Sequence, residues 1–210
     1  DQGFVLQSDR VAGVRGDASA LVLGLNTARH WLESGAVDVC LVGGVAGSCE
    51  APWLMLLDEH ELTASSQRDS GLVVGEAAAF VLLGRDGPGP AIRSWSRQGE
   101  PDERALRPQT IAQALKDVAT TLAGPSGLSV LLDANGLTER TKRWSFAETR
   151  ALGAQKITTR KVQPATFLGD VSVATLPLYL GLASHVPSGK TLVAVAHGFD
   201  EAAGAVLIEP

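Results

Sequence analysis

Residues 35–44 read Gly-Ala-Val-Asp-Val-Cys-Leu-Val-Gly-Gly, a short apolar run that is bounded by glycines. Short runs of this kind, rich in β-branched residues, are typical of strands. We therefore predict a strand over residues 37–42, in a sheet that is covered on both faces. The leucines and alanines before it recur at helical spacing, which predicts a helix over residues 17–35 that Gly35 ends.

Strand-like and helix-like segments alternate on both sides of residues 84–90, a stretch rich in glycine and proline that is typical of a linker. This alternation predicts a layered α/β architecture with one half at residues 1–85 and the other at 86–210. The expected elements are two strands within 71–83 that meet near Gly75, strands at 91–95 and 128–132, helices at 108–122, 144–152 and 174–183, and an antiparallel pair at 191–196 and 203–208.

Composition excludes several classes of function. The chain has 210 residues and a formal net charge of −5, which argues against a nucleic-acid-binding face. No apolar run approaches the roughly 20 residues that span a bilayer, and no signal segment is visible. Cys40 and Cys49 are expected to be reduced thiols of a cytoplasmic protein. The four histidines lack ligand spacing, so no metal is expected. No nucleotide-binding glycine motif is present, and no cofactor is expected.

Four segments occur in an order that is informative about the family. They are the helix and strand ending at Gly43-Gly44, then Arg68-Asp69-Ser70-Gly71-Leu72-Val73-Val74-Gly75-Glu76-Ala77-Ala78, Ala134-Asn135-Gly136-Leu137-Thr138, and Leu168-Gly169-Asp170 with His197-Gly198-Phe199. Together they resemble the β-ketoacyl synthases of the thiolase superfamily. The resemblance implies a thiolase-like α/β/α sandwich, and the short stretch before residue 18 implies that its N-terminal half is incomplete.

The same resemblance locates the positions at which a ketosynthase carries its catalytic residues. The cysteine nucleophile corresponds to Ala18, and a shift of one residue gives Asp17 or Ser19. The two histidines correspond to Asn135 and Asp170. Alanine cannot attack a thioester, a neutral amide cannot transfer protons as imidazole does, and a carboxylate repels a developing oxyanion. The sequence therefore predicts a degenerate active site with no catalytic residue.

A scaffold with an emptied site resembles the chain-length factors of type II polyketide and aryl-polyene pathways. The resemblance implies a non-catalytic subunit that pairs with an active ketosynthase and helps to shape its acyl tunnel. It also implies that any acyl carrier protein is contacted through that partner. The strand after the nucleophile helix would form the dimer interface, through Val37, Val39, Leu41 and Val42.

Two other functions stay open from the sequence. Ser19 lies at the start of the predicted helix and could serve as the nucleophile of an acyltransferase or thioesterase, provided that a base such as His197 lies beside it. Alternatively, the chain is a structural or regulatory remnant.

Overall fold

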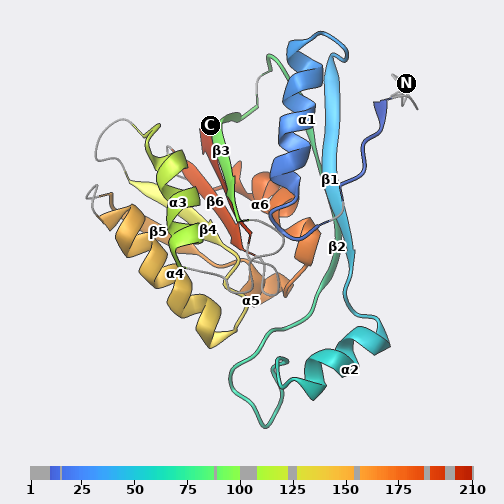
Figure 1. The fold of residues 1–210 in the computed structure, drawn as a ribbon, viewed down its shortest axis with the longest axis vertical. Helices are drawn as coiled ribbons and strands as arrows, with labels where there is room; N and C mark the ends of the chain where they lie inside the picture. The colour runs from blue at the N-terminus through green and yellow to red at the C-terminus, as the bar shows by residue number, and fades with distance from the viewer. Residues whose placement is uncertain are drawn as a thin grey trace.

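The computed structural model describes residues 10–14, 16–87, 89–99, 108–122, 127–153, 157–186, 190–196 and 202–209. Figure 1 shows its helices and strands in order along the chain. The helices are α1 (Leu21–Glu33), α2 (Ala51–Glu59), α3 (Pro108–Ala119), α4 (Thr138–Ala151), α5 (Ala165–Leu168), the 3-10 helix η3 (Ser172–Ala174) and α6 (Thr175–Ala183). The strands are β1 (Val39–Gly47), β2 (Glu76–Gly84), β3 (Ala91–Gln98), β4 (Leu128–Leu132), β5 (Thr159–Val162), β6 (Thr191–Ala196) and β7 (Ala203–Glu209).

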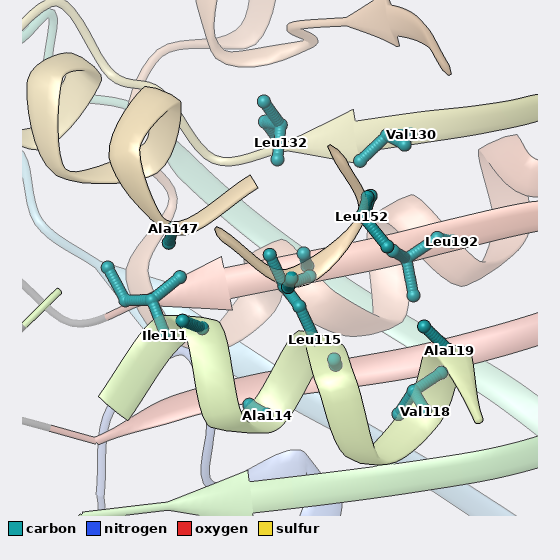
Figure 2. Packing of buried hydrophobic residues seen from close by; sticks show 14 of the residues in the cluster. Ile111, Ala114, Leu115, Val118, Ala119, Val130, Leu132, Ala147, Leu152 and Leu192 are labelled. Carbon is teal, nitrogen blue, oxygen red and sulfur yellow. The ribbon is translucent and has the colours of Figure 1, made fainter. Parts of the chain in front are cut away.

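The centre of the molecule is a five-stranded sheet in the order β3-β7-β6-β4-β5. Strands β5, β4 and β6 are parallel, whereas β7 runs antiparallel to both β6 and β3. Helices α3 and α4 cover one face, where Ile111, Leu115 and Val118 of α3 point towards α4 and the sheet (Figure 2). All five residues of β4 are buried, as expected for a strand between two helical layers.

Helices α1 and α6 cover the other face of this sheet and join the two halves of the chain. The buried side chains of α1 share one apolar cluster with those of α6, β6 and β7. At its surface, α1 also contacts β3, because Trp95 Nε1 donates a hydrogen bond of 2.7 Å to Asn26 Oδ1. The guanidinium of Arg29 lies 5.7 Å from the centroid of the Trp95 ring. The central sheet thus has helices on both faces, which confirms the predicted α/β/α layering.

A further layer lies beyond α1 and α6, where β1 and β2 form an antiparallel pair with Val39 opposite Gly84 and Gly47 opposite Glu76. One face of this pair packs against α1, α6 and η3. The opposite face exposes apolar side chains and is here called the outer face. Its large exposed members are Val39, Leu41, Val45, Phe80 and Leu82.

This exposure contradicts the prediction that the strand after α1 is covered on both faces. Gly43 has no side chain on the outer face, and the Phe80 ring occupies the space where one would lie. A Cβ on Gly43 would come within 2.3 Å of Phe80 Cδ1. A run of apolar residues looks the same whether one or both faces are covered, so the sequence could not decide between them.

Most other elements appear where they were predicted. The strands at 128–132 and 191–196 are confirmed, as is the antiparallel partner of the latter, and α6 begins with Pro177 in its first turn. Helix α1 ends before Gly35, whose φ of +70° closes it. The prediction of two strands meeting near Gly75 is wrong, because β2 is a single strand and residues 71–75 form a loop with isolated bridges. The expected turn at Gly198 lies outside the described residues.

Candidate functional site

Asn135 and Asp170 lie side by side although 35 residues separate them in the chain. Asn135 follows the carboxyl end of β4, and Asp170 lies between α5 and η3. Asn135 Nδ2 donates a hydrogen bond of 2.5 Å to Asp170 Oδ2. The fold therefore brings together the two positions that the sequence suggested for the histidines, and their side chains are partners of each other.

Asp170 is fixed by its backbone as well as by its side chain. Its Oδ1 accepts a hydrogen bond of 2.9 Å from the amide of Ser172, the first residue of η3. Its own amide donates to the Val73 carbonyl over 2.6 Å, and its carbonyl accepts from the Gly75 amide over 2.9 Å. The loop at 71–75 is thus hydrogen-bonded directly to the site.

Arg140 supplies a positive charge between two carboxylates. Its Nη1 lies 3.4 Å from Asp133 Oδ2 and 3.7 Å from Asp170 Oδ2, and its side chain is only 7% exposed. Trp144 Nε1 donates a hydrogen bond of 2.9 Å to Asp133 Oδ1. We call Asp133, Asn135, Arg140, Trp144 and Asp170 the polar cluster.

Sequence reasoning missed three members of the polar cluster. The sequence alone did not assign Asp133, Arg140 or Trp144 to the site. Arg140 was not selected because arginine on a polar helix usually faces solvent. The available signal was spacing: Arg140 and Trp144 are four residues apart, so they share one face of α4. Trp144 belongs to the buried core, which places Arg140 on the inner side.

The polar groups of the cluster form hydrogen bonds within the protein. Each carboxylate accepts hydrogen bonds, and Asn135 Oδ1 accepts one from the Leu137 amide over 3.4 Å. A nucleophile needs an adjacent base to activate it. Asn135 cannot act as that base, because its amide is neutral and its N–H donates a hydrogen bond to Asp170. The arrangement suits a rigid connection between loops better than proton transfer.

Tyr179 of α6 is 1% exposed and lies within the field of the polar cluster. Burial raises the pKa of the Tyr179 phenol, and the charges of Asp133 and Asp170 raise that pKa further. In the unfolded chain the phenol ionises near its ordinary pKa of about 10. The folded state therefore retains a proton that the unfolded state loses, so this contribution to stability is complete below pH of about 10 and falls as the pH rises above it.

Since Tyr179 is the only tyrosine, its ionisation can be followed alone. We expect no tyrosinate absorbance from the folded protein at a pH that ionises the phenol of the urea-unfolded chain. The absorbance should appear together with the loss of helical circular dichroism. A tyrosinate signal that rises near pH 10 while the fold persists would contradict the burial of this phenol.

The residues at the start of α1 are buried. Ala18 is 5% exposed, and Ser19 has no exposed surface. Asp17 Oδ1 accepts hydrogen bonds of 2.6 Å from both the amide and the hydroxyl of Ser19, and Arg97 Nε donates one of 3.0 Å to Ser19 Oγ. The hydroxyl is thus committed to Asp17, and His197, the base considered for it, lies outside the described residues.

The four residues expected at a dimer interface divide between two environments. Val39 and Leu41 project from the outer face, and Val37 is half-buried just before β1. Val42 instead packs in the cluster beneath α1 and is 8% exposed. An interface on this strand would therefore use Val39 and Leu41 together with Phe80 and Leu82, while Val42 belongs to the chain's own core.

Metal-binding groups and membrane-spanning helices are both absent from the described residues. In these ranges no group of three or more His, Cys, Asp or Glu side chains is placed to hold a metal ion. The helices described here are all too short or too polar to cross a bilayer.

Comparison with known proteins identifies the fold. Residues 12–87 match the family model described as the N-terminal domain of β-ketoacyl synthase. No curated protein sequence matches the chain significantly.

Solved ketosynthases have the same architecture. A type II polyketide synthase acyl-carrier protein in complex with its ketosynthase, bound to the hexaketide, matches with a TM-score of 0.78 and 10% identity, over 95% of this chain and 62% of that one. A β-ketoacyl synthase from Burkholderia phymatum STM815 matches with a TM-score of 0.76 and 13% identity, over 92% of this chain and 60% of that one. The ketosynthase ApeO in complex with its chain length factor ApeC, from Xenorhabdus doucetiae, matches with a TM-score of 0.73 and 14% identity, over 92% of this chain and 58% of that one.

The chain spans about three-fifths of the length of these solved structures. At identities of 10–14%, the similarity concerns the fold alone. The family match and the structural matches agree on one conclusion: this chain has the thiolase-like fold of the ketosynthases.

Proposed function

We propose that this protein is a non-catalytic, ketosynthase-like subunit that pairs with an active ketosynthase, in the manner of a chain-length factor. The observation that carries the proposal is the hydrogen bond between Asn135 and Asp170. The two side chains that the resemblance aligns with the catalytic histidines are hydrogen-bonded to each other, and the residue that it aligns with the nucleophile is Ala18. The catalytic cysteine and histidines would come from the partner.

The outer face of β1 and β2 supports a role in pairing. Leu41 is 56% exposed and Phe80 is 53% exposed, and both lie on neighbouring strands among other apolar side chains. Contiguous exposed apolar surface on a protein generally marks an interaction site. We propose that the active ketosynthase covers this face and that an acyl carrier protein is contacted through that partner.

The proposal is tested by co-expressing the chain with an active ketosynthase from the same organism, purifying through a tag on one chain and weighing the product by native mass spectrometry. We expect a one-to-one complex whose condensing activity requires both chains. A ketosynthase that is fully active alone and does not bind this chain would refute the pairing.

Replacing Leu41 and Phe80 together by aspartate is expected to weaken the complex at least about a hundredfold, because two charges would be buried in an apolar interface. Both side chains are exposed, so the free chain should keep its circular dichroism spectrum. Phe167→Asp is the control for an exposed aromatic residue elsewhere, since Phe167 is 91% exposed and lies on α5 rather than on β1 or β2. Equal retention of the ketosynthase by the double variant and the control would place the interface elsewhere.

The alternative of Ser19 chemistry has a direct test. Because the Ser19 hydroxyl is buried and donates to Asp17, we expect an activated acyl or fluorophosphonate probe to leave residue 19 unlabelled in the folded protein. Peptide mass spectrometry after labelling checks this. Stoichiometric modification of Ser19 that Ser19→Ala abolishes would favour an acyltransferase or thioesterase instead.

A further inference from the structure

Positive charge is concentrated in one segment of an otherwise acidic chain. Residues 138–162 contain seven lysines and arginines against two glutamates, a net charge of +5. The whole chain contains 18 lysines and arginines against 23 acidic residues. The remaining residues therefore carry eleven positive and 21 negative charges, a net of −10. The segment forms α4 and β5, at the side of the molecule opposite β1 (Figure 1).

Three exposed residues line up along the outer side of α4. Lys142, Phe146 and Arg150 are spaced four residues apart, so they lie in one row along the helix, about 12 Å from first to last. Phe146 is 52% exposed between the two cations. We call these three residues the α4 row.

The charges of the α4 row form no ion pair among the residues that the structure describes. Arg143 pairs with Glu139, and Lys161 pairs with the buried Glu148. In contrast, among the described residues no ion pair involves Lys142, Arg150 or the exposed Arg160 of the neighbouring edge strand β5. Two cations that are unpaired among the described residues, Lys142 and Arg150, therefore flank one exposed aromatic ring.

We infer that the α4 row is a docking site for an acidic helix of another protein. The matching face would carry carboxylates at positions i and i+8 and an apolar side chain at i+4, so that each cation meets a carboxylate while Phe146 is buried. Aromatic residues and arginine are the side chains that most often dominate binding at interfaces. A nucleic acid fits less well, because its phosphates would be repelled by the net charge of −10 on the rest of the chain.

This inference does not depend on the proposed function, because α4 lies on the other side of the central sheet from the outer face of β1 and β2. It also concerns direct contact with this chain, whereas the proposed function assigns a carrier protein to the partner ketosynthase. Helix α4 carries the row on its outer side and Arg140 and Trp144 of the polar cluster on its inner side, so one helix connects the two.

The test uses a fluorescein-labelled, stapled helical peptide with Glu, Leu and Glu at i, i+4 and i+8, and fluorescence anisotropy with the intact chain. We expect saturable binding that weakens as salt is raised. Both Phe146→Ala and the double variant Lys142→Glu, Arg150→Glu should lower the affinity at least about tenfold. The double variant Arg85→Glu, Lys116→Glu makes the same change of charge elsewhere and should bind the peptide as the wild type does.

The inference is overturned by any of three results, measured on variants whose circular dichroism is unchanged. The first is an equal loss of affinity in the Arg85→Glu, Lys116→Glu control, which would mean that binding depends only on the net charge of the chain. The second is equal binding of a peptide with the same composition but a scrambled order of Glu and Leu. The third is tighter, row-dependent binding of a DNA duplex or of phosphatidylserine vesicles than of the peptide.

Discussion

Replacing Arg140 with methionine is expected to lower the free energy of unfolding by about 3–5 kcal/mol. Methionine fills much of the same space, but it removes the cation that the carboxylates of Asp133 and Asp170 share. Removal of one partner from a buried ion pair costs more than the pair itself contributes, because the remaining charges stay desolvated. Urea denaturation followed by circular dichroism measures the effect.

Arg150→Met is the matched control for this experiment. Arg150 lies on the same helix but is exposed, so its replacement should change the free energy of unfolding by no more than about 0.5 kcal/mol. Equal stabilities of the Arg140 and Arg150 variants would mean that Arg140 does not hold the polar cluster together.

The Gly136→Ala variant is expected to lose at least about 3 kcal/mol of unfolding free energy. Gly136 has a φ of +96°, and a Cβ on it would come within 2.1 Å of the Gly71 carbonyl oxygen. The two backbones cannot separate freely, because the Gly71 amide donates a hydrogen bond to the Gly136 carbonyl over 3.2 Å. Thermal unfolding of the purified variant measures the loss.

Gly181→Ala provides a control of opposite sign. Gly181 lies in α6, and a Cβ on it would meet no atom within 4 Å. Alanine is preferred to glycine within helices, so this variant should gain about 0.5–1 kcal/mol. If alanine were tolerated equally well at 136 and 181, the close crossing of the 71–75 loop and the β4–α4 turn would be wrong.

The sequence predicted the layered architecture because strands that are buried on both faces, such as β4, and helices with one apolar face are visible as patterns. It also selected Asn135 and Asp170, which the fold brings within hydrogen-bonding distance. Neither Arg140 nor Asp133 could be selected in the same way. Their importance depends on the contact with the Asp170 carboxylate, which lies 30 residues beyond Arg140 in the chain, and that contact is not local.

The exposure of the outer face was beyond sequence reasoning for a different reason. Residues 39–47 alternate between an inner and an outer face, yet both faces are apolar or glycine. Hydrophobic patterning shows that a face of a strand can be buried, but it does not show which other element buries that face. The same limit applies to Val42, which was expected at an interface and packs in the core.

The position of α1 between the two sheets also determines how the molecule should come apart. The glycine- and proline-rich stretch at 84–90 would act as a hinge if the segments on either side had separate cores. Instead, α1 shares its buried residues with α6, β6 and β7, and its Asn26 is hydrogen-bonded to Trp95 of β3. Neither half can lose its packing alone, so denaturation should be a single cooperative transition, with the tryptophan and circular dichroism signals changing together.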